Sequence, residues 1–371
     1  EKKVDRIDPE LSLERLRNLN ISSNDSLNAL VYYLKGRCYF LSKKFDLAAK
    51  YFQKSVHVVN TTPELEITNI KPASYNGLGR TTYFQNNLVE ALILTEKGIE
   101  SFIPEGERLH TIHFLMICKA IYLEKLHRKD ESLRTLEELW KEKDHIESLE
   151  VLLNMFELHA RLLGRSKLYE EAISYATRGI DLAMLNKMDD RSVELYTTLG
   201  SIYTLIDELE EAEQSLLSAL ELNLSGEKEY LLISTYTQLG RLYLKQGKWS
   251  SAEDALNKAI DIGKKQESFD ALRICQAMSN LGDCYFKQNS FIQGIKVYEN
   301  ALVQVQKHSL KNEERKLLLR LCPFWKKRDI KKYQKLVDRL LIVDLELEKN
   351  FLDEILILGG DKINDEIMSF H

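Results

Sequence analysis

The chain contains 371 residues, of which 44% are hydrophobic and 29% are charged, and its formal net charge is −5. This length is too great for one typical globular core, so two or more domains or an extended array are expected. The nearly balanced charge argues against a generally basic protein that binds nucleic acid or membranes, and no apolar run approaches membrane-spanning length. Only 5 prolines are present, which favours a chain that is helical almost throughout.

The N-terminal segment precedes any repeating pattern. Residues 1–28 are interpreted as a linker with a partial helix, and one helical stretch is predicted over residues 9–19. Because residue 1 is Glu and not Met, we expect an N-terminal domain to be missing ahead of this segment. The 5 cysteines are widely spaced, and no secretory signal precedes them, which indicates reduced core thiols in a cytoplasmic protein.

A small residue recurs at an almost constant interval along residues 29–343. Its positions are Gly36, Gly79, Ala120, Ala160, Gly200, Gly240 and Gly282. The gaps between them are 43, 41, 40, 40, 40 and 42 residues. A second small residue follows twelve positions after each of them, at Ala48, Ala91, Ser132, Ala172, Ala212, Ala252 and Gly294. Seven paired coincidences predict an array of repeated units.

Each unit is predicted to be a hairpin of two helices, helix A and helix B. In helix A a large residue lies four positions before the small residue and an aromatic residue or leucine lies three after it, as in Tyr236, Gly240 and Tyr243. These offsets place all three side chains on one helical face. The small residue allows helix B to approach closely. One hairpin cannot bury such apolar faces alone, so the hairpins must stack into an all-α solenoid.

A basic run extends from Lys311 to Lys335, with ten Lys or Arg and three Asp or Glu residues. Such a run could contact nucleic-acid phosphates. However, apolar residues interleave with the charges as a core stripe, which favours a solvated face or a contact with an acidic partner protein. An eighth repeat is expected over about residues 311–343.

The C-terminal residues 344–371 are predicted to form a capping helix and a tail. Residues 344–358 are amphipathic, and a Gly359-Gly360 pair ends this stretch. A solenoid must cover its last apolar face, so the helix is interpreted as a cap. Alternatively, its second apolar stripe could hold another copy of the chain.

No convincing catalytic, cofactor or metal site is found in the sequence. Gly77-Leu78-Gly79 lies inside a predicted helix A and lacks the preceding strand that a dinucleotide-binding loop requires. His110 and His113 are three residues apart, but a metal site would need more ligands than they supply. We therefore expect no enzyme activity, no cofactor and no bound metal.

The repeated pattern resembles the tetratricopeptide repeat over about residues 29–343. The best unit carries Leu239-Gly240, Tyr243 and Ala252, whereas the third and fourth units are degenerate. The common repeat has about 34 residues, so a period of about 40 implies helices that are longer by more than one turn. The resemblance implies a right-handed superhelical solenoid of about 8 units, in which helix A lines the inner wall.

Long-helix arrays of this period resemble the peptide receptors of Gram-positive quorum sensing, a family that includes the Rap phosphatases, PlcR and NprR. Regulators in this family carry a helix-turn-helix DNA-binding domain ahead of the array, and Rap proteins carry a three-helix bundle there. Neither domain fits into the 28 residues before the repeats. The chain is therefore most similar to the peptide-binding part of the neutral-protease regulator in this family.

The resemblance implies a cytoplasmic transcriptional regulator that binds a short signalling peptide and switches between oligomeric states such as dimer and tetramer. Its output would be transcription of protease genes and control of sporulation. DNA would be bound only through the missing N-terminal domain, and the peptide-free array would bind a response-regulator phosphotransferase of the sporulation relay. Two alternatives stay open. One is a Rap-type phosphatase without its helical bundle, and the other is a protein-binding scaffold that senses no peptide.

In this repeat family, helix A side chains that flank the small residue hold an extended peptide. Amide side chains can bond a peptide backbone, and arginine can grip a carboxylate with two hydrogen bonds. Projected onto this sequence, these positions are Asn76, Arg80, Asn154, Arg161, Thr197, Ser201, Thr237, Gln238, Arg241, Gln276, Asn280 and Asp283. We expect the three arginines to contact carboxylates and the three asparagines to clamp the peptide backbone.

Overall fold

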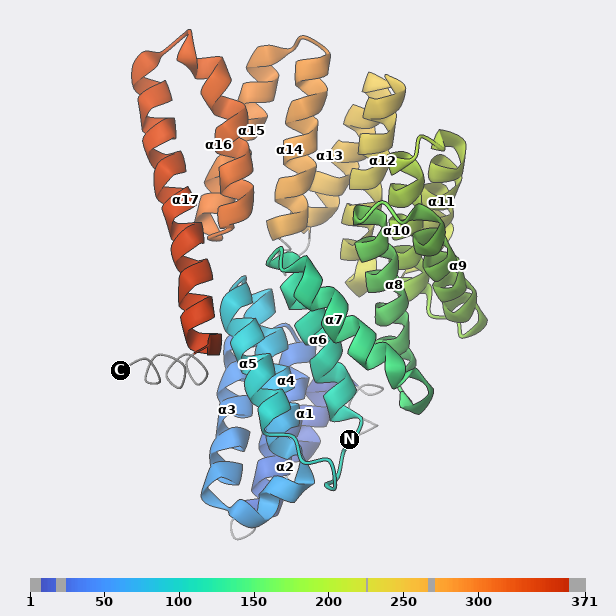
Figure 1. Cartoon of the computed structure of the whole chain (residues 1–371), viewed down its shortest axis with the longest axis vertical. Coiled ribbons are helices and arrows are strands. Elements are labelled where there is room, and N and C mark those ends of the chain that lie inside the picture. Colours follow the sequence, from blue (N-terminus) through green and yellow to red (C-terminus); the bar gives the residue numbers. More distant parts are fainter. Residues whose placement is uncertain (1–7, 18–24, 225, 266–270, 360–371) are drawn as a thin grey trace, which may run out of the picture. The chain divides into compact units, whose positions relative to one another are not determined.

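The computed structural model describes residues 8–17, 25–224, 226–265 and 271–359. All regular structure within these ranges is helical. The chain divides into two compact units, Glu1–Ile202 and Tyr203–His371. Each unit is a run of helices that pack in chain order, as an all-α solenoid requires (Figure 1).

The first unit begins with α1 (Pro9–Arg17), which packs on the helix that follows it. Four hairpins come next: α2 (Asp25–Leu41) with α3 (Phe45–Thr61), α4 (Ile70–Phe84) with α5 (Leu88–Glu100), α6 (Thr111–Lys125) with α7 (Lys129–Lys141), and α8 (Leu149–Arg165) with α9 (Tyr169–Leu185). Two short 3-10 helices, η1 (Pro63–Thr68) and η2 (Lys143–His145), lie between hairpins. Helix α10 (Asp189–Leu205) belongs to this unit as far as Ile202.

The second unit contains α11 (Leu209–Glu221) and the 3-10 helix η3 (Gly226–Leu231). Three hairpins follow: α12 (Leu232–Gln246) with α13 (Trp249–Lys265), α14 (Ala271–Lys287) with α15 (Phe291–Lys307), and α16 (Lys311–Lys326) with α17 (Ile330–Gly359). In both units the A helices, which have even numbers, also contact one another in series. None of the described helices combines the length and hydropathy that crossing a bilayer requires.

The small residue of helix A faces a larger side chain on helix B. A Cβ atom placed on Gly240 would lie 2.5 Å from the Leu256 side chain, and one on Gly36 would lie 2.6 Å from Phe52. Leu256 and Phe52 are fully buried at these contacts, with 0% and 1% exposure. The predicted close approach of helices A and B is confirmed, and it explains why the small residue recurs with the repeat.

Helix A ends in the same kind of turn in successive repeats. A residue with positive φ follows the last helical turn, and the next N–H donates to a carbonyl five residues back. Lys248 N donates to Tyr243 O at 2.9 Å, and Leu168 N donates to Leu163 O at 3.0 Å. This bonding pattern satisfies carbonyls at the helix end and reverses the chain. The positive-φ residue before each donor is Gly247 in one turn but Lys167 in the other, so glycine marks only some of these turns.

Two tyrosines tie neighbouring hairpins together in the second unit. The Tyr243 hydroxyl on α12 donates to Glu213 Oε1 on α11 at 2.9 Å. One repeat later, the Tyr285 hydroxyl on α14 donates to Glu253 Oε1 on α13 at 2.8 Å. Burial and the bonded glutamate raise the pKa of each phenol to about 12. Both phenols therefore stay protonated and act as donors at neutral pH.

The end of the array differs from the prediction of a separate capping helix over residues 344–358. These residues prolong α17, which runs without a break from Ile330 to Gly359. The reason is that neither Gly nor Pro occurs between Ile330 and Leu358 to end the helix. Val343 is buried in this helix, whereas Leu341 and Leu345 are 60% and 56% exposed. The predicted tail after Gly359 and residues 1–7 and 18–24 of the predicted N-terminal linker lie outside the described residues.

Candidate functional site

The predicted binding residues lie on A helices and divide between the two units. We call the polar face of α6, α8 and α10 up to Ile202 the first wall, and the polar face of α12, α14 and α16 the second wall. Asn154, Arg161, Thr197 and Ser201 belong to the first wall. The second wall contains Thr237, Gln238, Arg241, Gln276, Asn280 and Asp283. Asn76 and Arg80 lie on α4 in the first unit, away from both sets.

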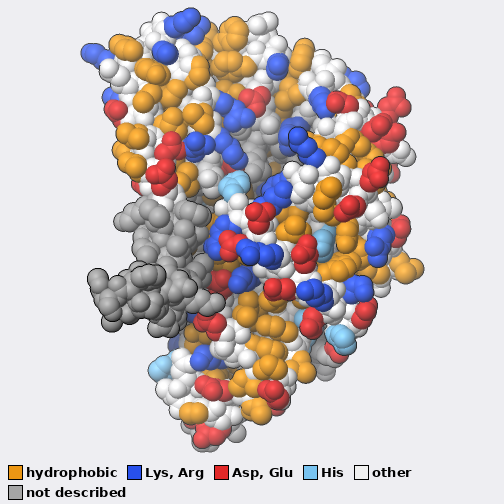
Figure 2. All heavy atoms as spheres, in the orientation of Figure 1, with side chains coloured by type: hydrophobic (Ala, Val, Ile, Leu, Met, Phe, Trp, Pro, Cys, Tyr) orange, Lys and Arg blue, Asp and Glu red, His pale blue; other side chains and the backbone are white. Residues whose placement is uncertain are grey.

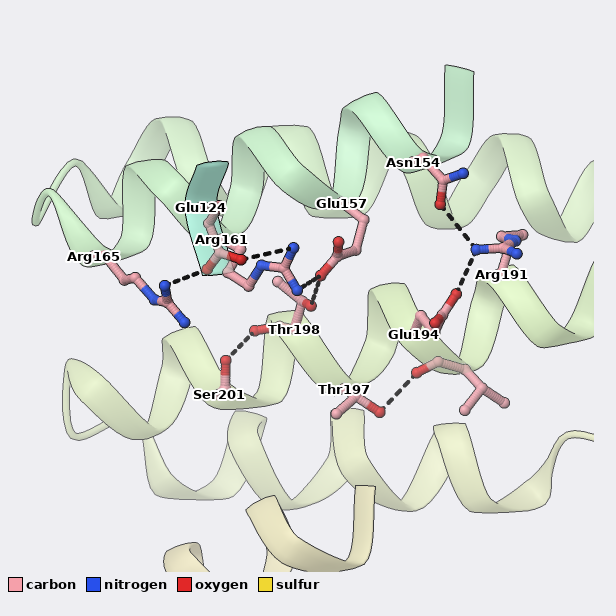
Figure 3. Close-up of polar contacts among 11 residues, drawn as sticks. Glu124, Asn154, Glu157, Arg161, Arg165, Arg191, Glu194, Thr197, Thr198 and Ser201 are labelled. Atoms are coloured by element: carbon pink, nitrogen blue, oxygen red, sulfur yellow. Dashed lines mark hydrogen bonds and ion pairs between the residues drawn. The ribbon is translucent and has the colours of Figure 1, made fainter. Parts of the chain in front are cut away.

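Glu124 is the centre of an ion-pair network in the first wall (Figure 3). Its side chain is only 4% exposed, although acidic side chains are rarely buried unless they are paired. Arg165 donates to one carboxylate oxygen, and Arg161 Nη2 lies 3.6 Å from the other. Arg161 Nη1 also lies 3.3 Å from Glu157 Oε1, which accepts a 2.8 Å hydrogen bond from the Thr198 hydroxyl. The network therefore joins α6, α8 and α10.

These charges neutralise one another within the chain. Burial alone would raise the pKa of Glu124, but the attraction of Arg161 and Arg165 outweighs burial and lowers that pKa. Burial likewise opposes the charge of Arg161, while Glu157 and Glu124 raise its pKa. A ligand carboxylate that approaches Arg161 would have to compete with two glutamates already in place. Arg161 is therefore unsuited to the carboxylate contact that the sequence predicted.

A second cluster surrounds Arg191, near the start of α10 (Figure 3). Arg191 Nη1 donates to Asn154 Oδ1 at 2.9 Å and to Glu194 Oε2 at 2.7 Å, and Nη2 lies 3.5 Å from Glu150 Oε1. The amide oxygen of Asn154 is thus already used. Among the described residues nothing accepts a hydrogen bond from its Nδ2 group, which is the part left for a peptide carbonyl.

Three of the predicted hydroxyl contacts bond to their own helices. The Thr197 hydroxyl donates to Val193 O at 2.7 Å, and the Thr237 hydroxyl donates to Ile233 O at 2.6 Å. Both threonines are buried, with 8% and 6% exposure. A threonine in a helix readily bonds to the carbonyl one turn back. Ser201 is half-buried and donates to Thr198 O at 2.8 Å.

Of the two predicted binding residues on α4, Asn76 and Arg80, one already has a partner within the chain. The Arg80 guanidinium lies 4.9 Å from the centre of the Phe40 ring, in a cation–π contact. Asn76 Oδ1 is buried and accepts no hydrogen bond from any of the described residues. Of the two, Asn76 keeps the unused polar atom.

The second wall leaves more of its predicted residues available. Arg241 and Gln276 are exposed, and Arg241 Nη1 donates only to Gln238 Oε1, at 3.1 Å, among the described residues. Asn280 Nδ2 donates to Gln276 O, one turn back on α14, at 3.0 Å. Asp283 is the exception because Arg320 on α16 donates to its two oxygens at 3.1 and 3.2 Å. The structure thus brings Gln238 and Arg241 together, and likewise Gln276 and Asn280.

Side chains at the same position of different repeats have different surroundings, as the position directly after the small residue shows. It holds arginine in four repeats, at residues 37, 80, 161 and 241. Arg80 stacks on an aromatic ring, Arg161 enters a buried ion-pair network, and Arg241 is exposed. Arg37, which the prediction missed, lies 5.8 Å from the Tyr33 ring centre.

Sequence reasoning also missed Glu124, Arg165, Arg191 and Arg320. Glu124 was detectable, since it lies four positions after the small residue, where Phe40, Tyr83 and Leu244 lie in other repeats. A charge at a position that is uncharged in the other repeats predicts a buried partner. Nothing comparable marks the arginines, which stand at ordinary surface positions in the pattern. No group of three or more His, Cys, Asp or Glu suited to a metal ion occurs in the described part of the chain.

Comparisons with known proteins identify the repeat and the fold. Tetratricopeptide repeat models match residues 191–265 and 29–56. No curated protein matches the sequence significantly.

Three solved structures align over most of the chain. A Rap protein complexed with Competence and Sporulation Factor is 13% identical, with a TM-score of 0.57, over 88% of this chain and 99% of that one. NprR in complex with its cognate peptide NprX is 13% identical, with a TM-score of 0.56, over 88% and 98%. The apo form of RapI is 14% identical, with a TM-score of 0.55, over 95% and 94%.

At such identities the likeness concerns the fold. It agrees with the helix hairpins, the close A–B contacts at the small residues and the packing of A helices in series. The chain is an array of tetratricopeptide-like repeats and has the fold of these Rap and NprR structures.

Proposed function

We propose that this chain is the peptide-sensing array of a signalling protein and that a short peptide binds on the second wall. The observation that carries the proposal is that polar side chains on α12 and α14 are accessible and make few hydrogen bonds within the described chain. Gln238, Arg241, Gln276 and Asn280 are exposed or half-exposed there, and no ion pair engages them among the described residues. Helices α12 and α14 contact each other. Burial lowers the pKa of Arg241, while the charge of Asp283 on α14 acts to raise it, so the Arg241 side chain lies near α14 and we treat the four residues as one surface.

The chemistry of this surface suits a short peptide with a free carboxylate. The Arg241 guanidinium would donate two hydrogen bonds to that carboxylate, either at the peptide terminus or on an acidic side chain. The amides of Gln276 and Asn280 would each offer a donor and an acceptor to the peptide backbone. Asp283 is held by Arg320 and Tyr298, so its charge is compensated and does not repel an anionic ligand.

The proposed output is a shift between conformations of the array. A peptide that bonds to two A helices favours the arrangement in which its contacts are best, and its differential affinity sets the size of the shift. We propose that this changes the homo-oligomeric state and, through it, transcription of protease genes and sporulation in the cytoplasm. DNA contact would come from a separate domain. In the peptide-free state the array would bind the phosphotransferase of a response-regulator relay.

The comparisons support the choice of ligand class. One similar structure is described as NprR with its cognate peptide, and another as a Rap protein with Competence and Sporulation Factor. A fold that holds peptides in such proteins makes a peptide the first ligand to try on the second wall. Neither likeness specifies the peptide sequence.

The test is a thermal-shift screen of the full chain against synthetic short peptides, followed by calorimetry on the hits. A peptide that binds only the native state raises the melting temperature. Each hit is then compared as a free carboxylate and as a C-terminal amide, on the wild type and on Arg241→Ala. We expect Arg241→Ala to weaken the free acid about 30-fold, which corresponds to about 2 kcal/mol, and to affect the amide far less.

Asn280→Ala supplies the second arm of this test. It removes the proposed backbone clamp, so it should weaken the free acid and the amide alike while circular dichroism stays unchanged. Unaltered calorimetric affinity in both variants would place the peptide elsewhere. A screen without any hit would favour the scaffold alternative, in which the array binds proteins and senses no peptide.

A second candidate is a phosphatase of the Rap type. The alignments with the Rap and RapI structures extend over 99% and 94% of those chains, with TM-scores equal to that of NprR within 0.02. We propose to test it by incubating the chain with a phosphorylated response-regulator receiver domain. Accelerated loss of the aspartyl phosphate would favour this candidate, whereas stoichiometric binding without dephosphorylation would favour the receptor.

A further inference from the structure

The basic run of the last repeat separates into two parts in the structure. On α16 most of its cations have partners within the chain. Arg320 is bonded to Asp283 on α14, and Arg315 Nε lies 2.6 Å from Asp344 Oδ1 on α17. Lys316 and Lys311 pair with glutamates on α16 and α17 at 2.8 and 2.6 Å. This half of the run is neutralised by its surroundings.

The other half gathers around the turn between α16 and α17. We call Lys326, Lys327, Arg328, Lys331 and Lys335 the basic turn. All five side chains are exposed, and no ion pair to any of them occurs within residues 8–17, 25–224, 226–265 and 271–359. Lys332 differs, because it pairs with Glu299 at 2.6 Å and lies over the Trp325 ring. Lys and Arg side chains gather at the upper left of Figure 2, where Figure 1 places this turn.

The local helix dipole adds to this positive charge. Lys331 lies in the first turn of α17, which contains no acidic residue, although a helix N-terminus favours acids and disfavours cations. Asp329 is the single acid between residues 326 and 335, and its Oδ1 accepts the backbone N–H of Lys332 at 3.0 Å as a helix cap. Lys331 is therefore placed against the dipole of α17, whereas Lys326 and Lys327 lie at the C-terminal end of α16, where cations are favoured. Arg328 lies 4.0 Å from the centre of the Phe324 ring and donates to Phe324 O, but no carboxylate among the described residues neutralises it. Five exposed cations without an acidic partner in the described chain point to an acidic partner outside it.

An exposed apolar side chain lies among these cations. Ile330 begins α17 between Arg328 and Lys331, and it is 58% exposed. An apolar residue ringed by charge is the usual make-up of a protein–protein contact, with a desolvated centre and a polar rim. Phosphate backbones offer nothing for an isoleucine to contact. Four of the five cations are lysines, whereas close recognition of phosphate favours the arginine fork.

We propose that the basic turn is a docking surface for an acidic segment of a partner protein. Carboxylates of the partner would surround the five cations, and one apolar side chain of the partner would pack on Ile330. The surface is distinct from the proposed peptide site because it lies on α16 and α17 and uses none of the residues of α12 and α14. The docking proposal is therefore independent of the proposal that a peptide binds on the second wall.

The test uses a fluorescently labelled synthetic peptide of glutamates with one central leucine, measured by anisotropy on the full chain at several salt concentrations. The variant is Lys327→Glu/Lys331→Glu/Lys335→Glu. The matched control is Lys50→Glu/Lys265→Glu/Lys307→Glu, which makes the same change in net charge at exposed lysines scattered along α3, α13 and α15. Circular dichroism and melting temperature check that both variants fold.

We expect the variant in the basic turn to bind the acidic peptide at least about 10-fold more weakly, while the scattered control stays within about twofold. Ile330→Ser should weaken binding about threefold without changing the salt dependence, because it removes only the apolar contact. Equal losses in the two triple variants would overturn the proposal, since they would reflect net charge alone. Absence of wild-type binding even at about 0.05 M salt would also overturn it.

Two further probes distinguish other anionic partners. A labelled DNA duplex of similar charge and vesicles of phosphatidylserine with phosphatidylcholine are titrated under the same conditions. Tighter binding of either probe than of the acidic peptide, together with its loss in Lys327→Glu/Lys331→Glu/Lys335→Glu, would assign the surface to nucleic acid or to a membrane and overturn the proposal.

Discussion

The first wall and the second wall occupy the same register of the repeat but use their polar side chains in opposite ways. In the first wall, Glu124 has 4% exposure and is held by Arg161 and Arg165. In the second wall, Arg241 is exposed and bonds only to Gln238 among the described residues. The repeat thus fixes where a side chain lies, whereas its charged neighbours on adjacent A helices decide whether it remains available.

The acids account for this difference. The first wall has Glu124, Glu157 and Glu194 within ion-pair distance of its arginines. In the described part of the second wall, Arg320 takes up both carboxylate oxygens of Asp283, and Glu313 on α16 pairs with Lys316 on the same helix, so neither acid holds Arg241 in an ion pair. Internal pairs hold A helices together but leave little for a ligand. The comparison is the reason why we propose that the first wall serves stability and the second wall serves binding.

The largest expected effect is loss of the buried carboxylate in the first wall. Glu124→Gln removes the buried charge that Arg161 and Arg165 share and leaves Arg161 with Glu157 alone, so we expect a loss of about 3 kcal/mol in the free energy of unfolding. Asp283→Asn is the matched change in the second wall. There Asp283 and Arg320 are 34% and 36% exposed, so the expected loss is about 1 kcal/mol or less. Urea denaturation measures both, and equal losses would remove the distinction between the walls.

A similarly large effect should appear in acid, through His159 on α8. Its ring is 5% exposed, lies 4.6 Å from the Tyr175 ring and bonds through Nδ1 to Met155 O at 3.1 Å. Burial lowers the pKa of His159 from 6.5 to about 4. Because the unfolded chain binds this proton more readily, stability should fall as pH drops from about 6.5 to about 4, by up to about 3 kcal/mol.

The pH dependence of unfolding tests this assignment. His159→Phe cannot take up the proton, so its stability should vary much less between pH 6.5 and pH 4 than that of the wild type. His57→Phe, the same replacement at an exposed histidine, serves as the matched control. Glu124, whose pKa is also lowered, adds stability that is present above its usual value of 4.5 and lost as pH falls through its lower value in the folded chain. An unchanged slope in His159→Phe would contradict the assignment.

The fold was largely predictable because the repeat records a steric requirement. Gly240 has to be small since a Cβ there would lie 2.5 Å from Leu256, and Gly36 and Gly282 meet the same need in their hairpins. The turns after helix A were harder to predict from the sequence. A glycine such as Gly247 indicates a positive φ, but Lys167 adopts the same conformation without being a glycine. Residues 344–358 were predicted as a capping helix, and in the structure they prolong α17, because amphipathicity alone does not show where a helix begins.

For the candidate site, the sequence predicted which positions of each repeat lie on helix A, but not which of those side chains are available to a ligand. A projection from the small residue placed all twelve side chains on A helices, but it could not tell which would turn inward. Thr197 and Thr237 bond their own helix, and Arg161 is neutralised by Glu124, which lies 37 positions earlier in the sequence. Such pairings depend on the distance between helices, which the local sequence pattern does not contain.

The equivalent arginines of the two walls provide a smaller and more specific test. Arg161→Ala removes a partner of Glu124 and Glu157, so we expect it to cost about 2 kcal/mol of stability. Arg241→Ala, at the same position two repeats later, removes an exposed side chain and should change stability by less than about 0.5 kcal/mol. Thermal unfolding compares the two variants directly. The comparison fails if Arg241→Ala destabilises the chain as much as Arg161→Ala does.

The smallest expected effect concerns the tyrosines that link hairpins in the second unit. Tyr243→Phe removes the donor to Glu213 Oε1, and Tyr285→Phe removes the donor to Glu253 Oε1, each at a half-buried site. A hydrogen bond to a charged acceptor would be worth about 1 kcal/mol here, and the two losses should add, because the pairs are separate.

An ultraviolet titration of the phenols checks the same bonds independently. Glu213→Gln keeps an acceptor for Tyr243 but removes the charge, so the pKa of that phenol should fall from about 12 towards its usual value of 10. Tyr285, bonded to Glu253, should be unaffected in this variant. If both phenols already titrate near 10 in the wild type, these bonds do not persist in solution. The second unit would then lose these two links between hairpins and keep ion pairs such as Asp283 with Arg320.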